Sequence, residues 1–469
     1  MKKSVFYNCM MAMALASTLS ISSCGDDDPA DPVVPNQPDP PTNPDQPSQD
    51  KAMSPAAQKE RMDAIAQEFM RLTPASDFQS YADLSDYVYN TYREGNYDWD
   101  SVNKWAKSCW DASRKATGKT TTNDFGWGAE VYTEYTSLLL ASNFTGHFRA
   151  NNGRWIKESG TFNDLQFTFT DQNAQTCVLK LETSGNVKKV KAFNLEDWVD
   201  YDYDSSNYKY TDYLNRTQCT IGVPENAVVT LTQNGAQLVK TTVKVDLASL
   251  SGEDFDISKN SITASALVEM SNGYRFNMSQ VAYSGNQNCS VTCDISKNGT
   301  KLASVSAASD LSGIPSCNVE AFTKSDFDFD DCDTDNATAK NAFVKIDILG
   351  KLQLQGVVTD VRKYVDFINR ADDSEEDETR FKQWLNSANE LAQISLFYDN
   401  TSVRQASMKL EAFNETGWGG YNYWTMEPVL VFFDGSSNSM FDVFFNDTDF
   451  KSTIKAFEEL IGKYEDLFY

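Results

Sequence analysis

Apolar residues recur at two different spacings along this chain. In the first part they lie three or four apart, as in Met62, Ile65 and Phe69, which is the spacing of one face of a helix. Ser54-Pro55 supplies a cap residue followed by proline at the first helical position, a typical helix start. Three helices are therefore expected, from residue 54, from about residue 77 and over about 99–116.

From Phe144 onward the period becomes two. Leu165, Phe167 and Phe169 alternate with polar residues, which predicts strands with one buried and one wet face, typical of an antiparallel sheet. Asn-Gly pairs accept the positive φ of tight hairpin turns. These pairs occur at Asn152-Gly153, Asn234-Gly235, Asn272-Gly273 and Asn298-Gly299.

Two of the predicted hairpins look like copies of each other. Displaced by about 64 residues along the chain, Asn234-Gly235 falls on Asn298-Gly299 and Leu238 falls on Leu302. Shared hairpin chemistry could also produce this match. Either way, a meander of repeated hairpins is expected.

Further on, Val344–Leu354 alternates as a single long strand would, with Gly350 inside it. Two helices are expected to follow. The chain then returns to sheet at Val403–Phe413 and in a hairpin of Met426–Phe433 and Met440–Phe445. A last helix, Asp449–Leu467, is expected to cover the wholly apolar run Leu430–Phe433.

The pattern predicts an α+β fold: N-terminal helices, then a large curved antiparallel sheet of repeated hairpins, with C-terminal helices packed on it. The expected divisions are a helical region at 51–125 and the hairpin-rich sheet with its C-terminal helices at 126–469. In layout alone this resembles Bacteroidota surface lipoproteins that have an N-terminal helical part and a hairpin-rich sheet.

The first residues read as an export signal at 1–23, with Lys2 and Lys3 before a short apolar run. The apolar run has about half of the roughly 20 residues that a helix needs to span a bilayer, so a transmembrane helix is not expected here. Ile21-Ser22-Ser23-Cys24 resembles a bacterial lipobox, which implies a lipid on Cys24. Gly25 and the Asp26–Asp28 run resemble the acidic export tag of Bacteroidota lipoproteins. A polar, proline-rich tether, 24–50, follows. We expect a lipid anchor in the outer membrane, facing the exterior.

The charge of the chain limits the kinds of partner that it is expected to bind. The formal net charge is −26, and removal of Lys2 and Lys3 with the signal makes it −28. Nucleic acid is not an expected partner, because phosphate binding relies on clustered Lys and Arg and none occurs. Seven cysteines remain besides Cys9 and Cys24. They lack Cys-x-x-Cys spacing, and most are interpreted as buried apolar thiols.

Catalytic motifs are scarce. The single histidine, His147, is interpreted as a solvated strand residue, and no Gly-x-Ser-x-Gly or phosphate loop occurs. Zinc lacks its usual ligands. A regular calcium loop that begins at Asp326 fails at Asp331 and Ala337. Irregular calcium sites need no such pattern, so a site at Asp326–Asp335 is left open. No cofactor, metal site or catalytic residue is assigned.

Two Trp-rich segments with flanking glycines are the candidate ligand site. Rings on such loops either face a sugar or peptide or fold back onto the core. The candidate residues are Trp127, Trp418, Tyr421, Tyr423 and Trp424.

The expected function is non-enzymatic binding or adhesion, with a glycan as the favoured ligand and a host or neighbouring protein as another. The first alternative is a carrier in which the sheet and a covering helix enclose an apolar ligand. The second is a glycoside hydrolase that uses two carboxylates, for which 67 acidic residues offer many candidates.

Overall fold

The computed structural model describes residues 52–113, 120–122, 130–140, 144–204, 209–252, 260–283, 288–310, 340–416, 420, 422–446 and 449–468. The helices of this part are α2 (Pro55–Leu72), the 3₁₀ helix η2 (Ala75–Phe78), α3 (Gln79–Tyr92), α4 (Asp100–Ser113), α5 (Val361–Asp372), α6 (Glu378–Leu391), α7 (Phe441–Phe444) and α8 (Lys451–Phe468).

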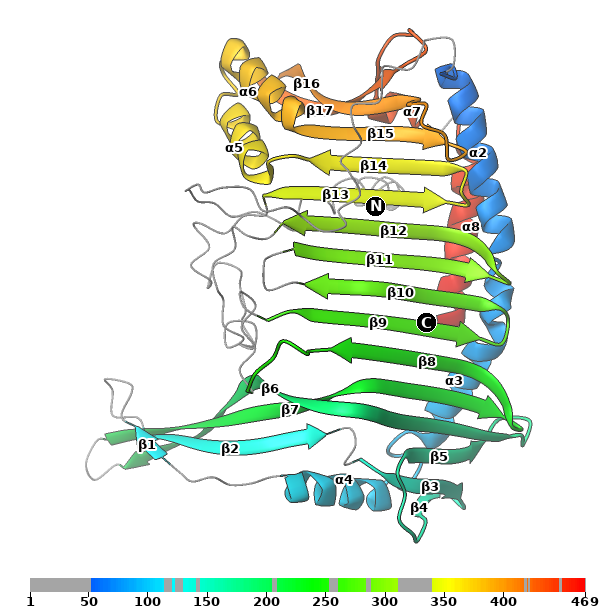
Figure 1. Cartoon of the computed structure of the whole chain (residues 1–469), viewed down its shortest axis with the longest axis vertical. Coiled ribbons are helices and arrows are strands. Elements are labelled where there is room, and N and C mark those ends of the chain that lie inside the picture. Colours follow the sequence, from blue (N-terminus) through cyan, green and yellow to red (C-terminus); the bar gives the residue numbers. More distant parts are fainter. Residues whose placement is uncertain are drawn as a thin grey trace.

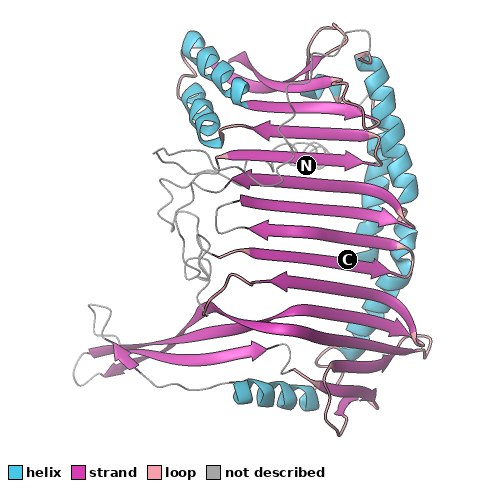
Figure 2. Ribbon diagram, in the orientation of Figure 1, coloured by secondary structure: helices cyan, strands magenta, loops and turns pink. Residues whose placement is uncertain are grey.

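Strands make up the larger share of the described residues (Figure 2). They are β1 (Thr120–Thr122), β2 (Glu130–Leu140), β3 (Gly146–Asn151), β4 (Arg154–Lys157), β5 (Leu165–Thr170), β6 (Thr176–Asp204), β7 (Lys209–Gln233), β8 (Ala236–Asp246), β9 (Ile262–Met270), β10 (Tyr274–Tyr283), β11 (Asn288–Lys297), β12 (Thr300–Asp310), β13 (Asn341–Ile348), β14 (Leu352–Val358), β15 (Ala392–Tyr398), β16 (Ala406–Thr416), β17 (Asn422–Phe432) and β18 (Ser439–Met440).

All of these strands belong to one sheet. From β5 to β18 each strand pairs antiparallel with the next, as the alternating sequence predicted. Two pairs are parallel, β2 with β7 and β3 with β5. The α+β prediction is thus confirmed in outline: N-terminal helices, a large and mostly antiparallel sheet, and C-terminal helices.

The sheet has one apolar and one polar face. Adjacent strands set Val268, Phe276 and Ile295 in register, and this row continues through Ala303 and Ile348. The neighbouring row, on the opposite face, consists of Asn277, Asp294, Ser304, Asp347 and Gln353. We call the face that carries Phe276 the apolar face.

The helices pack on this apolar face. Figure 1 shows α2 and α8 running across the strands at one of their ends, and α5 and α6 at the other end of the last strands. Met62 and Ile65 of α2 join a cluster with Tyr398 and Phe432. α5 packs on Ala342 and Val358, and α6 packs on Leu410 and Met426. The two groups of helices thus leave a strip of the apolar face between them.

Three of the four Asn-Gly pairs form the expected turns, whereas Asn272 does not have positive φ, so the turn at Asn272-Gly273 is not type I′. Asn152, Asn234 and Asn298, with the glycine after each, have positive φ, as type I′ hairpins require. The two hairpins that looked alike also share the bounds of their second strands and one irregularity. Strand β12 follows β8 at a distance of 64 residues, and each hairpin has a register shift at the same place, Leu231/Thr232 and Ile295/Ser296.

The prediction of one strand over Val344–Leu354 is wrong. Leu349 and Gly350 both have positive φ, 57° and 68°, and turn the chain between β13 and β14. The Asp347 carboxylate accepts a hydrogen bond from the Gly350 amide at 2.8 Å, which stabilises the turn. Alternation could not distinguish the two structures, because a hairpin with a three-residue loop, residues 349–351, keeps the apolar residues of both strands on one face.

A joint between helices and sheet forms around Tyr274, which is 2% exposed. Its hydroxyl donates to the Asp77 carboxylate at 2.9 Å, and the hydroxyl oxygen also lies 3.2 Å from the Leu72 carbonyl oxygen. Lys297 binds the same carboxylate at 2.5 Å and lies 5.0 Å from the centre of the Tyr274 ring. This network fixes the turn between α2 and α3 against the hairpin ends.

Alkaline pH should weaken the fold through its buried tyrosines. Burial, with Asp77 adding to it, raises the pKa of Tyr274, and burial also raises the pKa of Tyr398. Their neutral forms are therefore favoured in the folded state. The stabilisation is complete below the unfolded pKa of about 10 and is lost as the pH rises through the folded pKa. Urea unfolding at several pH values should show the free energy of unfolding falling above pH ~10.

Tyr274→Phe is the matched variant for this prediction, since it has no phenol to titrate. Its free energy of unfolding should fall less steeply above pH ~10 than that of the unaltered chain. Identical pH dependence in the two chains would show that Tyr274 does not contribute to the loss.

Candidate functional site

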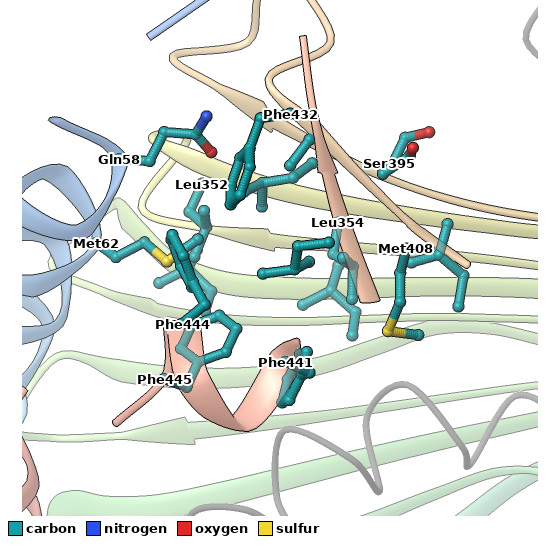
Figure 3. A pocket seen from close by; sticks show the side chains of 17 residues that line it. Gln58, Met62, Leu352, Leu354, Ser395, Met408, Phe432, Phe441, Phe444 and Phe445 are labelled. Atoms are coloured by element: carbon teal, nitrogen blue, oxygen red, sulfur yellow. The ribbon is translucent and has the colours of Figure 1, made fainter. Parts of the chain in front are cut away.

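The apolar face forms a groove between α2 and α7. Its floor comes from alternate residues of β13 to β17, and its side walls come from α2 and from the segment around α7 (Figure 3). The lining residues are Gln58, Met62, Ile346, Ile348, Leu352, Leu354, Ile394, Ser395, Leu396, Ala406, Ser407, Met408, Leu430, Phe432, Phe441, Phe444 and Phe445.

The wall at α7 departs from the expected strand over Met440–Phe445. Pairing with β17 ends at Met440, and the chain then forms a short helix, Phe441–Phe444. Phe441 and Phe444 are three residues apart, so a helical turn places both rings on one side, where they are buried against Phe432. A strand would send the two rings to opposite faces. Leu430 and Phe432 are thus covered mainly by α7, with Phe450 and Ile454 of the expected C-terminal helix packed beside it.

The groove is small but continuous with a larger surface. It encloses about 90 Å³, less than the roughly 150 Å³ of an engineered apolar cavity that binds benzene. Ile346 on its floor is in register with Val305 of β12, whose side chain is 38% exposed. A ligand could therefore place one end in the groove and extend over the open apolar face.

The groove walls offer almost no polar chemistry. Ser395 and Ser407 alternate with Ile394, Leu396 and Met408 along their strands, so their side chains project to the polar face. This leaves Gln58 as the polar side chain on the groove side of the described lining. No acidic or basic residue lies in that lining. The arrangement suits binding by burial of apolar surface.

Most sequence-predicted site residues lie outside the described residues. These are Cys24, Trp127, Trp418 and Tyr421, together with the possible calcium segment Asp326–Asp335. Within the described part, no group of three or more His, Cys, Asp and Glu side chains is placed to hold a metal ion.

Trp424 packs inward on the sheet. Its half-buried ring lies against Phe381 and Leu385 of α6, and the Lys382 ammonium lies 4.5 Å from the ring centre. Its amide donates to the Glu375 carbonyl at 2.8 Å, which joins β17 to the turn before α6. The Trp424 ring therefore packs as part of the core between the sheet and α6.

Tyr423 differs from its neighbour. By alternation its side chain lies on the polar face, where its hydroxyl donates to the exposed Glu415 carboxylate at 2.9 Å. This hydrogen bond, together with the negative charge of Glu415, raises the pKa of Tyr423. Tyr423 and Trp424 therefore do not form one binding surface.

His147 is not solvated as the sequence suggested. Its ring stacks on Phe162 with centroids 3.8 Å apart, and Nε2 lies 2.7 Å from Oδ1 of Asp164. Lys180 lies 3.2 Å from the other oxygen of Asp164. Burial opposes ionisation of Asp164, but hydrogen bonds from His147 and Lys180 hold its pKa below the ordinary value. His147 thus takes part in a hydrogen-bond network with Asp164 and Lys180 on the polar face.

Cys177, Cys289 and Cys293 are free thiols. Cys177 is fully buried, while Cys109, Cys289 and Cys293 are half-buried. Burial raises the pKa of Cys109, Cys177 and Cys289, which lowers their thiolate content and their reactivity. The prediction of buried apolar thiols thus holds for Cys177, whereas the other three are buried only in part.

Sequence reasoning missed the groove itself. Gln58 was an unremarked polar residue on the first helix, and Phe441 and Phe444 were assigned to a strand. The available signal was the spacing of Phe441, Phe444 and Phe445, which fits a helical turn better than strict alternation.

In comparisons with known proteins, no family model, curated protein or solved structure matches this chain. Among the described helices, none combines the length and apolarity required to cross a membrane.

Proposed function

We propose that this chain is a non-enzymatic binding protein that holds an apolar ligand in the groove between α2, α7 and β13–β17. The observation that supports it is the lining, in which aliphatic and phenylalanine side chains form the whole floor. The second support is the open apolar face next to the groove, since exposed apolar surface of this kind usually marks an interaction site.

The lining favours an apolar ligand over a glycan at this place. A sugar needs several hydrogen-bonding groups beside any ring that it stacks on, and the groove side of the described lining supplies Gln58 alone. An aliphatic body needs none and gains roughly 25 cal/mol for each Å² that it buries. A glycosidase would need two carboxylates, and the described lining contains no acid.

Glycan or protein adhesion remains a second candidate, at a different place. The exposed Tyr423–Glu415 pair, at the loop end of β16 and β17, is the observation that favours it. Trp418 and Tyr421 lie in the same connection. In either case we propose that a lipid on Cys24 anchors the protein in the outer membrane, facing the exterior.

Binding of a neutral fluorescent probe, 1-N-phenylnaphthylamine, tests the groove. The full chain carrying Cys24→Ala, which has no acyl chains of its own, should bind the probe saturably. Met408→Trp puts a large ring on the groove floor and should weaken the affinity at least tenfold. The measurement is the fluorescence titration.

The control adds the same ring outside the groove. Val443 on α7 is 56% exposed and does not line the groove, so Val443→Trp should leave the affinity unchanged. Equal binding by the Met408→Trp and Val443→Trp chains would place the probe elsewhere and overturn the proposal.

A further inference from the structure

The side chain of Gln58 is the one polar feature of the groove that the lining does not explain. It is 0% exposed. Its Nε2 donates to two carbonyls, that of Met53 at 2.9 Å and that of Gln405 at 3.2 Å. Both protons of the amide are therefore used, and the orientation of the amide is fixed, because the opposite orientation would place its oxygen against two acceptors.

The other end of this amide, Oε1, faces the groove. It is buried and accepts no hydrogen bond from any described residue. Figure 3 shows this oxygen on the side of Phe432, with the nitrogen turned away. An unsatisfied buried acceptor of this kind destabilises a protein by roughly 1–3 kcal/mol. The groove thus contains one acceptor that is set in apolar walls and lacks a donor.

The chemistry of the missing donor can be narrowed. An ammonium group would have to leave water for walls with no negative charge, which costs far more than one hydrogen bond returns. A carboxylate or phosphate has no proton to donate. Buried water is usually held by about three hydrogen bonds, and the described lining offers one acceptor. A neutral hydroxyl requires a single acceptor and tolerates apolar neighbours.

We propose that the groove ligand is a neutral amphiphile, with a hydrocarbon body and one hydroxyl group that donates to Oε1 of Gln58. The inference rests on the proposed function, because it assigns the class of ligand that enters the same groove. The hydrocarbon body lies on Leu354, Met408 and Phe432, and any remaining length continues over the open apolar face toward Val305.

A pair of isomers tests the hydroxyl. 1-Dodecanol and undecyl methyl ether have the same atoms and nearly the same length, but only the alcohol has a donor. Both are used to displace 1-N-phenylnaphthylamine from the full chain carrying Cys24→Ala. A hydrogen bond to a buried acceptor should make the alcohol bind about tenfold more tightly than the ether.

Gln58→Met removes the acceptor while keeping the length of the side chain, and the alcohol-to-ether ratio should fall to about one. A ratio near one in the chain with Gln58 intact overturns the inference, and so does a tenfold ratio that persists in Gln58→Met. If Gln58→Met does not fold, the chain with Gln58 intact is used for a second measurement. Nuclear Overhauser contacts are then sought between the carbinol hydrogens of the alcohol and the Gln58 amide. Their absence overturns the inference.

Failure of the inference can be told from failure of the proposed function. If alcohol and ether bind equally and Met408→Trp weakens both, the groove binds apolar ligands without reading a hydroxyl. If neither compound displaces the probe and Met408→Trp has no effect on it, the proposed function itself fails.

Discussion

Replacing Trp424 with alanine should lower the free energy of unfolding by about 3 kcal/mol, near the lower limit for removal of a large ring from a core because the ring is half-buried. The change leaves a cavity between β17 and α6, where the ring packs on Phe381 and Leu385. It also removes the ring that faces the Lys382 ammonium. Urea denaturation of the altered and unaltered chains measures the difference.

Tyr423→Phe is the matched control on the same strand. It removes one exposed hydrogen bond, that to Glu415, and should change the free energy of unfolding by less than about 1 kcal/mol. A glycan-array screen of both variants separates the two roles. Unchanged stability with lost glycan binding in Trp424→Ala would show that this ring is a ligand platform rather than part of the core.

Cys24→Ala should abolish incorporation of labelled fatty acid and release the protein from the membrane fraction. The reason is chemical, because the thioether that would carry the diacylglycerol cannot form on alanine. Two acyl chains are required for a stable anchor, so no partial retention is expected. Labelling of growing cells followed by fractionation measures both effects, and labelling that survives the change would show that Cys24 is not the acylated residue.

Replacing Asp26, Asp27 and Asp28 together with alanine is the control for the anchor prediction. Those residues are expected to direct the protein to the outer face without taking part in acylation. The triple variant should keep its lipid and lose accessibility to protease added to whole cells. Unchanged accessibility would show that the acidic run is not read as an export tag.

Local sequence was sufficient wherever the physics is local. Ser54 caps α2 by accepting from the Ala57 amide, and Pro55 takes the first helical position, where no amide hydrogen is needed. Asn234-Gly235 and Asn298-Gly299 specify their turns because few other pairs accept two positive φ values. Alternation in turn fixes which residues share a face, since the strand period is two.

The same patterns were insufficient where two structures have the same local signature. Val344–Leu354 reads equally well as a strand or a hairpin, and only pairing of β13 with β12 and of β14 with β15 decides. Met440–Phe445 was predicted as a strand, but in the structure its phenylalanine rings pack in a cluster with Phe432 and Met62, which a helical turn allows. In both cases contacts distant in sequence select the structure, because local propensities differ by only about 1 kcal/mol.

The candidate site belongs wholly to the tertiary structure. Gln58 receives its role from Gln405, which lies 347 positions further along the chain. The groove exists because α2, near the start of the described residues, and α7, near their end, pack on the same face of one sheet. Sequence by itself determined most of the elements and their apolar sides, and the turns at Asn152, Asn234 and Asn298. Which apolar sides were covered, and which polar atom was left without a donor, depended on long-range packing, because burial and hydrogen-bond satisfaction are properties of the assembled neighbours and not of the local chain.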